Sequence, residues 1–234
     1  MDLLISISIY ILSITIFIVL PFVILITATK KPPKTTKIPK IPKEEEFKGR
    51  YGEREIEEIL LESDRRITNE QIIKNLYLER ENGKTTEIDV ILILKNKIFV
   101  FESKNYSGWV FGNTRDKYWI QIFPNGKRYN FYNPTWQNYG HIKTLEEKLK
   151  NFPNLKYYSI ISFGYKATLK DIKNFFNDVH ITNYYNIDQK IRELTKDEDY
   201  IIDTQTLEII ERINDYATAN KTIELKHTRN YVEV

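Results

Sequence analysis

We predict a mixed α/β fold, a central β-sheet covered by helices, from three features of this 234-residue chain. Short runs of β-branched and aromatic residues alternate with amphipathic stretches of helical period. Their order is helix, strands, helix, strand, helix, helix, which is typical of a sheet with helices packed on its faces. About 190 residues remain once the N-terminal segment is set aside, enough for a single hydrophobic core.

Composition excludes several kinds of site. Cysteine is absent, so the chain forms neither disulfides nor thiolate metal sites, which fits a reducing compartment. Only three histidines are present, which leaves little material for a zinc centre or a histidine-based catalytic triad.

The start of the chain predicts a membrane anchor. Residues 3–29 carry no charged side chain and are dominated by Ile, Leu, Val and Phe. A helix crosses a bilayer with roughly 20 apolar residues. A cleaved signal peptide would show a basic start and a shorter apolar core, whereas the only early charge here is Asp2. We therefore expect one N-terminal transmembrane helix.

Residues 30–43 form a proline-spaced basic tether with six lysines and no acidic residue. Proline favours extended backbone, so we expect a semi-rigid spacer. Lysines on this side of the anchor predict a single-pass protein of the cell membrane, with its N-terminus outside and its body in the cytoplasm. Without the tether and Asp2, the chain has 29 basic and 31 acidic residues. The body is near neutral, so polyanion binding requires a local basic patch.

The body is expected to cover residues 44–220, and a polar tail follows over residues 221–234. Apolar and aromatic runs bounded by turn residues predict its strands. Expected strands lie at residues 72–78, 88–94, 98–101, 157–163 and 179–182, with several short ones between residues 107 and 136.

Amphipathic spacing predicts the helices. The first is expected to start near Tyr51, with Ile56 and Leu60 on its apolar stripe. Asn133 followed by Pro134 is typical of a helix start, because the missing N–H of proline costs least in the first turn. Further helices are expected over residues 133–150, 168–177, 188–194 and 204–216.

The rest of the chain is organised around the hairpin predicted over residues 87–104. Side chains alternate across a strand, so Glu102 and Lys104 share a face near the end of its second strand. Closing the hairpin brings Asp89, near the start of the first strand, toward this pair. Either the three charged groups simply emerge into water at the strand ends, or they form a site.

Asp89, twelve intervening residues and then Glu102-Ser103-Lys104 suit metal-assisted hydrolysis of phosphodiesters. Two carboxylates are hard ligands for Mg²⁺ (or Mn²⁺), with water and substrate phosphate completing the coordination shell. The backbone carbonyl of Ser103 is a further candidate ligand. Such a metal lowers the pKa of bound water, and Lys104 is suited to orient that water or to stabilise developing negative charge.

Two other features allow both a structural and a functional interpretation. Glu53, in the first turn of the first predicted helix, either complements the helix dipole or adds an active-site carboxylate, and spacing alone favours the dipole. Basic residues lie among aromatic ones between residues 107 and 136, a combination that can track a phosphate backbone and stack bases. Aromatic residues in a strand-rich region more often form core. The candidate nucleic-acid-binding residues are Arg115, Lys117, Lys127, Arg128 and Trp119.

Five motifs resemble the nuclease-related domain (NERD) family, which is assigned to the PD-(D/E)xK nuclease superfamily. They are G-x-x-G-E at residues 49–53, E-I-D-V at 87–90, F-V-F-E-S-K-N-Y-S-G at 99–108, Trp119, and N-P-x-x-Q-N-x-x-H at 133–141. Their order matches the family over about residues 47–155. The resemblance implies a restriction-endonuclease-like fold, which the rest of the chain completes.

The resemblance also implies roles for individual residues. Asp89 and Glu102 are expected as metal ligands and Lys104 as the catalytic lysine. Glu53 is expected as an accessory acid that binds metal or positions water, which reverses the interpretation from spacing. Gln137 is expected to orient substrate or to support the site.

Three further positions complete the comparison with the family. Asn133 is expected as a helix cap, and His141 as a structural or peripheral residue. Ser103 is a departure, since an apolar residue such as valine is common between the glutamate and the lysine. Only the backbone carbonyl is needed at that position, so the departure costs little.

The leading hypothesis is a membrane-anchored, Mg²⁺-dependent nuclease that acts on nucleic acid, with DNA the favoured substrate. A non-catalytic, membrane-tethered module that binds nucleic acid or protein is the first alternative. The near-neutral body supports that alternative, and the intact set of two acids and a lysine argues against it. A structural membrane protein that scaffolds partners is the third, and it leaves the hairpin unexplained.

Overall fold

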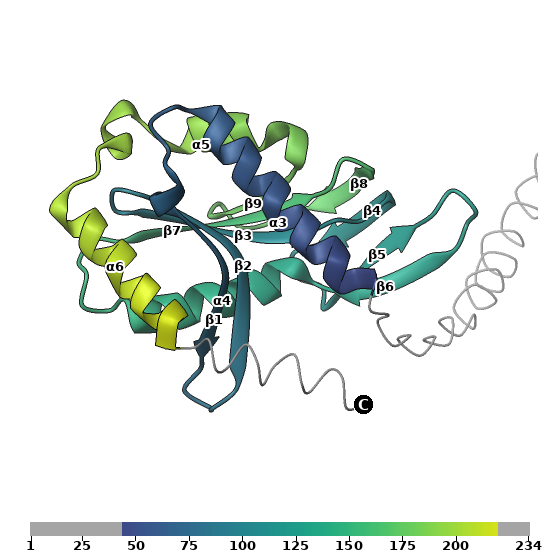
Figure 1. Ribbon diagram of the computed structural model, residues 1–234. Helices are drawn as coiled ribbons and strands as arrows, with labels where there is room; N and C mark the ends of the chain where they lie inside the picture. Colours follow the sequence, from purple (N-terminus) through teal and green to yellow (C-terminus); the bar gives the residue numbers. More distant parts are fainter. Residues whose placement is uncertain (1–43, 220–234) are drawn as a thin grey trace, which may run out of the picture. The chain divides into compact units, whose positions relative to one another are not determined.

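The computed structural model of the protein describes residues 44–219 (Figure 1). The predicted transmembrane helix over residues 3–29, the tether over residues 30–43 and the tail over residues 221–234 lie outside this range. Within it, no helix is both long enough and apolar enough to span a bilayer.

The central sheet has five strands in the order β1-β2-β3-β7-β9. The first three pair antiparallel, whereas β3, β7 and β9 pair parallel, so the sheet is mixed as predicted. β7 can return parallel to β3 because several strands and a helix lie between them in the chain. The strands are β1 (Ile72–Glu79), β2 (Thr85–Leu94), β3 (Lys97–Lys104), β7 (Lys156–Phe163) and β9 (Val179–Asn183).

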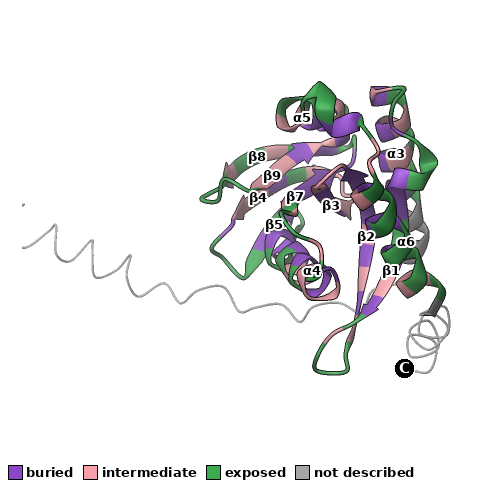
Figure 2. Cartoon of the chain, turned by 90° about the vertical axis from the view of Figure 1, so that its left-hand side faces the viewer, coloured by how far each residue is buried: buried purple, intermediate pink, exposed green. Residues whose placement is uncertain are grey.

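Helices cover both faces of this sheet, and buried residues gather between the layers (Figures 1 and 2). Alternation along β2 sends Leu92 toward α3 and α5 on one face, and Ile91 toward α4 and α6 on the other. Because both faces are covered, the strand reads as a nearly continuous apolar run. The helices are α3 (Glu44–Ser63), α4 (Pro134–Lys148), α5 (Ile187–Leu194) and α6 (Thr204–Ala219).

A second sheet of four strands follows β3 in the chain, where a single sheet is expected from the sequence. Its order is β6-β5-β4-β8, with β4 and β8 parallel and the other neighbours antiparallel. One face joins the core: the Trp119 ring stacks on Phe163 of β7, with ring centres 6.2 Å apart. The strands are β4 (Gly108–Asn113), β5 (Tyr118–Ile122), β6 (Arg128–Tyr132) and β8 (Ala167–Lys173).

The helix predicted over residues 168–177 is wrong, because this segment contains the strand β8. Leu169 and Ile172 are three residues apart, which is a helical spacing. In the structure they pack on the same side of the second sheet because the register with β4 shifts beside Lys170. One extra residue in a strand interrupts its alternation, and this irregularity disguised the strand.

The other predicted helices and strands are confirmed, with shifts at their ends. The largest shift is in α3, which begins at Glu44 rather than near Tyr51. The part of the helix before Tyr51 carries a glycine, Gly49, and no clear apolar stripe, so its helical character was not evident.

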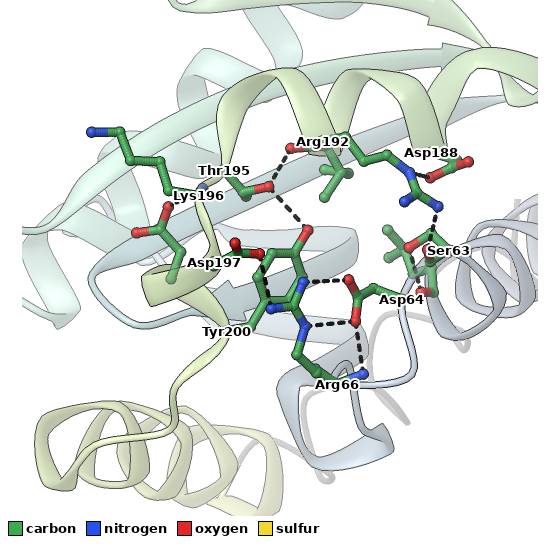
Figure 3. A network of polar contacts seen from close by, with 12 residues as sticks. Ser63, Asp64, Arg66, Asp188, Arg192, Thr195, Lys196, Asp197 and Tyr200 are labelled. Atoms are coloured by element: carbon green, nitrogen blue, oxygen red, sulfur yellow. Dashed lines mark hydrogen bonds and ion pairs between the residues drawn. The ribbon is translucent and has the colours of Figure 1, made fainter.

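A polar network joins the loop after α3 to the short helix η4 (Asp197–Tyr200), as Figure 3 shows. Arg66 donates hydrogen bonds to the carboxylates of Asp64 and Asp197. The Arg66 guanidinium also lies 4.0 Å from the centre of the Tyr200 ring. The network fixes the segments that follow α3 and α5 against each other.

The first residue of β3 is held in the same region. Lys97 Nζ lies 2.5 Å from Asp199 Oδ2 and 2.8 Å from the carbonyl oxygen of Leu194. Asp199 also accepts a hydrogen bond from the Lys196 N–H, at 2.7 Å. One positive and one negative group therefore neutralise each other at this end of β3.

Candidate active site

The candidate site lies at the point where β2 and β3 stop pairing with each other. Their ladder ends at the pair Val90 and Phe101, and β2 continues beyond it paired with β1 alone. The next residue toward the start of β2 is Asp89, whose Oδ2 accepts a hydrogen bond from the Ser103 N–H at 2.8 Å. A side chain thus replaces the backbone partner that the ladder would have supplied. The residue remains partly exposed, so it is open to a ligand from solvent.

The backbone facing Asp89 is also irregular. Asn75 of β1 stands between the pairs formed by its two neighbours, and its φ of +52° is left-handed. Asparagine tolerates this region better than most residues. The irregularity therefore lies directly across the sheet from the predicted metal ligand.

Glu102 is almost fully buried, and both of its carboxylate oxygens are bonded. Oε1 lies 2.5 Å from Lys104 Nζ, and Oε2 lies 3.1 Å from His141 Nε2 on α4. Lys104 donates a second hydrogen bond, at 3.3 Å, to Gln137 Oε1 on the same helix. The structure thus brings together Glu102, Lys104 and Gln137, as the sequence predicts.

His141 has a more central position than the sequence suggests. Its Nδ1 lies 2.8 Å from Thr86 Oγ1, and Arg80 donates to the same hydroxyl at 2.7 Å. Both ring nitrogens are therefore bonded, one toward β2 and the other toward Glu102. The signal that could have found it is its spacing of four residues from Gln137, which puts both side chains on one face of α4.

Two residues of α3, Gly52 and Glu53, lie close to Ser103 and Asp89. Glu53 is buried, and its charge contributes to raising the pKa of Asp89. A Cβ atom on the preceding Gly52 would lie 2.3 Å from Ser103 Oγ and 2.5 Å from Tyr184 Oη. These two hydroxyls are themselves 2.6 Å apart. Only glycine therefore lets α3 approach Ser103 this closely.

The charged groups strongly affect one another's ionisation. Burial and the Glu102 carboxylate raise the pKa of Asp89 well above its ordinary value, although Lys104 and the Ser103 N–H oppose the shift. Burial also disfavours the Glu102 anion, but Lys104 and His141 outweigh it and lower the pKa of Glu102. Burial opposes the charge of Lys104, but Glu102 outweighs it, so the pKa of Lys104 is raised and the amine stays protonated.

The donor set fits a hard divalent cation. Mg²⁺ is commonly bound by one or two carboxylates, with water and phosphate oxygens completing its shell. A cation beside Asp89 and Glu102 would also offset the repulsion that raises the pKa of Asp89. Within residues 44–219, no three His, Asp or Glu side chains converge on one metal position. Glu53 lies close enough for its charge to act on Asp89, and its accessory role stays a prediction.

The predicted nucleic-acid-binding residues do not all remain available. Trp119 is fully buried and donates its ring N–H to the Asn113 carbonyl at 2.9 Å, so it cannot contact a ligand. Its prediction as a binding residue is corrected: it belongs to the core. The four basic candidates are exposed on or beside the second sheet, and they are Arg115, Lys117, Lys127 and Arg128.

Asn133 caps α4 as predicted. Its side-chain oxygen accepts a hydrogen bond from the Thr135 N–H at 2.9 Å. Its amide donates to three carbonyl groups in the β4–β5 turn, those of Asn113, Thr114 and Asp116. The cap therefore fixes the start of α4, and with it Gln137, against the second sheet.

The sequence model of the family described as nuclease-related domain matches residues 48–164, half of the chain, and includes all the predicted site residues. The chain belongs to the nuclease-related domain family. This NERD family has the PD-(D/E)xK-like nuclease fold. An uncharacterized protein of Bacillus anthracis is 33% identical over 184 residues, which cover 78% of this chain and 83% of that protein. No solved structure gives a significant match.

Proposed function

We propose that this NERD protein is a divalent-metal-dependent nuclease that hydrolyses phosphodiester bonds of nucleic acid, with DNA the favoured substrate. The observation that carries the proposal is the meeting of Asp89, Glu102 and Lys104 where β2 parts from β3. The nuclease-like fold of the family supports the same function.

Each residue has a role that its contacts suggest. Asp89 and Glu102, with the Ser103 carbonyl as a further ligand, would hold Mg²⁺ or Mn²⁺, which when bound activates water and offsets phosphate charge. Glu102 raises the pKa of Lys104, and the amine donates hydrogen bonds to Glu102 and to Gln137. Gln137 accepts one of them and so limits the directions in which Nζ points.

The reaction is a hydrolysis. The oxygen of a water molecule bonds to phosphorus and loses one proton to the solvent, the bond from phosphorus to the leaving oxygen breaks, and that oxygen takes up one proton from the solvent. Negative charge builds on the non-bridging phosphate oxygens during this exchange. The protonated Lys104 is suited to stabilise that charge by direct hydrogen bonding.

The test is cleavage by the full-length chain, purified in mild detergent, of supercoiled, linear and single-stranded DNA and of RNA. We expect cleavage with Mg²⁺ or Mn²⁺ that is lost in EDTA and in Asp89→Ala and Lys104→Ala. Lys84→Ala and Asp178→Ala, which change exposed charges elsewhere, serve as matched controls. Cleavage that persists in EDTA or in both site variants contradicts the proposal.

We further propose that residues 3–29 anchor this nuclease in the cell membrane, with the N-terminus outside and the domain in the cytoplasm. The uncharged apolar stretch and the lysines that follow it support this topology. Alkaline extraction of membranes should leave the protein in the pellet. A protease added outside intact cells should spare the domain, and release or digestion contradicts the topology.

A non-catalytic binding module is the second candidate. One observation favours it: both oxygens of Glu102 are already bonded, to Lys104 and to His141. Salt-dependent DNA binding with no turnover in any divalent metal would support this module over the nuclease.

A further inference from the structure

The second sheet has one face that the core does not use. Strand pairing places Trp109, Tyr118, Ile120 and Tyr132 on this face, opposite to the buried Trp119. The four side chains are 49%, 44%, 37% and 45% exposed, respectively. Large apolar side chains gathered on an exposed face indicate a binding surface. The aromatic face, as we call it, comprises Trp109, Phe111, Tyr118, Ile120, Ile122 and Tyr132.

Positive charges accompany these rings. Lys117 Nζ lies 5.4 Å from the centre of the Tyr118 ring, and Lys170 Nζ lies 5.5 Å from that of Trp109. Arg128 lies on the same face of the sheet, paired with Ile122. Residues 108–133 contain four basic residues and one acidic residue, in a body that is otherwise near neutral. This is the local patch that polyanion binding requires.

Two elements connect the aromatic face to the candidate active site. The Tyr132 ring packs edge-on against Trp136, with ring centres 6.3 Å apart. Trp136 precedes Gln137, the residue that accepts a hydrogen bond from Lys104. Along the chain, only residues 105–107 separate Lys104 from β4. Groups on this face are therefore tied to the reactive groups through both α4 and β4.

We propose that the aromatic face binds an unpaired strand of nucleic acid and that the substrate of the candidate site is single-stranded; the substrate assignment rests on the proposed nuclease function. Exposed rings on a sheet can stack on unpaired bases, whereas a duplex keeps its bases in its own stack. Lysines beside the rings suit the phosphates between those bases. The centre of a protein-binding face is instead depleted of charged residues.

The test measures binding to the full-length chain in EDTA, where metal-dependent cleavage is suppressed. The probes are a fluorescent deoxythymidine oligonucleotide, its uridine counterpart and a DNA duplex of equal length. We expect both single strands to bind more tightly than the duplex. The double variant Trp109→Ala/Tyr118→Ala should weaken single-strand binding at least tenfold.

Two further variants sharpen the measurement. Ile201→Ala/Leu207→Ala removes side chains that are 62% and 52% exposed near and on α6, and should leave binding unchanged. Lys117→Gln/Lys170→Gln should reduce the slope of log affinity against log salt by about 0.7 for each lysine that contacts a phosphate. Thermal unfolding of each variant should match that of the unmodified chain, since all the altered side chains are exposed.

The outcomes separate this inference from the nuclease function. Equal affinity for duplex and single strands, or unchanged binding by the folded Trp109→Ala/Tyr118→Ala variant, overturns the aromatic face as a single-strand site. Cleavage in Mg²⁺ would stand in that case. Single-strand binding that depends on Trp109 but is never followed by cleavage instead overturns the nuclease and keeps the surface.

Discussion

Two lysines stand at opposite ends of β3, and each lies 2.5 Å from a carboxylate oxygen. At one end Lys97 and Asp199 neutralise each other, and their other hydrogen bonds go to the backbone. At the other end Lys104 and Glu102 lie beside a further acid, Asp89. Burial and the Glu102 carboxylate raise the pKa of Asp89. The two ion pairs therefore have similar contacts but different surroundings.

The difference separates a structural ion pair from the candidate active site. Lys97 and the backbone outweigh burial and lower the pKa of Asp199, so that carboxylate is stabilised as an anion. Around Lys104 the charges do not cancel in this way, because Asp89 lies beside the pair and Glu53 adds to the repulsion that raises the pKa of Asp89. A pair that is closed on itself only stabilises the fold, whereas an excess of buried negative charge attracts a cation.

The sharpest way to break the comparison is to neutralise one carboxylate at each end. Glu102→Gln and Asp199→Asn should each lower the free energy of unfolding by about 3 kcal/mol, because each removes the carboxylate that is paired directly with a buried lysine. Only Glu102→Gln should abolish cleavage. Urea unfolding and cleavage below the melting range check both effects, and loss of cleavage in folded Asp199→Asn contradicts the distinction.

The next effect concerns His141, which has no counterpart at the Lys97 end. His141→Ala should lower the apparent Mg²⁺ affinity about 10–100-fold, because Glu102 loses the group that orients it. It should also cost about 2 kcal/mol of stability, because Thr86 and Glu102 each lose a buried partner.

Titration of cleavage against Mg²⁺ distinguishes the two roles of His141. If orientation of Glu102 matters, excess metal should restore much of the activity of His141→Ala. Thr144→Ala, on the same helix but bonded only to the Gly140 carbonyl, is a matched control. Metal affinity that is unchanged in His141→Ala contradicts the positioning role.

Neutralising Asp89 should have the opposite effect on stability. Asp89→Asn keeps an acceptor for the Ser103 N–H and removes the repelled charge, so it should raise stability at pH 7 by about 1–2 kcal/mol. In a chain of this size, 1 kcal/mol corresponds to roughly 2–4 °C in Tm. Cleavage should be lost in the same variant.

The sign of the pH dependence follows from the raised pKa of Asp89. Below the ordinary value of 3.8 the group is protonated in both folded and unfolded chains, so the variant and the unmodified chain should be equally stable. The stability difference between Asp89→Asn and the unmodified chain should grow as pH rises from 3.8 toward the raised pKa of Asp89 in the folded chain, and should stay constant above it. Thermal unfolding across that range checks this, and a gap that narrows with rising pH contradicts it.

The smallest effects concern two residues with a positive φ: Lys95 in the turn of the hairpin, and Asn75 on the neighbouring strand β1. Lys95, at its turn, has a φ of +53°, so Lys95→Gly should stabilise the fold by about 0.5–1 kcal/mol without changing cleavage. Asn75→Ala should cost about 1 kcal/mol, because alanine tolerates a left-handed backbone poorly. Asn75→Gly is the control, since a loss of the same size in that variant would point to the side chain instead.

Sequence patterns located most of the fold because burial on both faces of a sheet gives a simple signal. Residues 90–94 of β2 and 98–101 of β3 are apolar without interruption, and the turn between them is marked by polar residues. β8 was missed because Lys170 is an extra residue that has no partner in β4, and it interrupts the alternation of side chains along the strand. The split into two sheets was also missed, since strand pairing depends on contacts that no local pattern contains.

The candidate site was likewise predictable from the sequence only in part. Alternation along one strand placed Glu102 and Lys104 together, and the family resemblance added Gln137. The link from Glu102 through His141 to Thr86 joins residues from three elements, so spacing within one element could not supply it. Trp119 was misassigned because an aromatic residue in an exposed sheet looks the same in sequence whichever face it occupies.

The close contact of Gly52 and Tyr184 around Ser103 has a consequence for synthesis of the chain. The ribosome makes α3 and the hairpin well before α4, and Tyr184 later still. A growing chain therefore holds both predicted metal ligands before it holds the residues that orient them. On the proposed function, an unfinished or truncated copy therefore lacks a completed site.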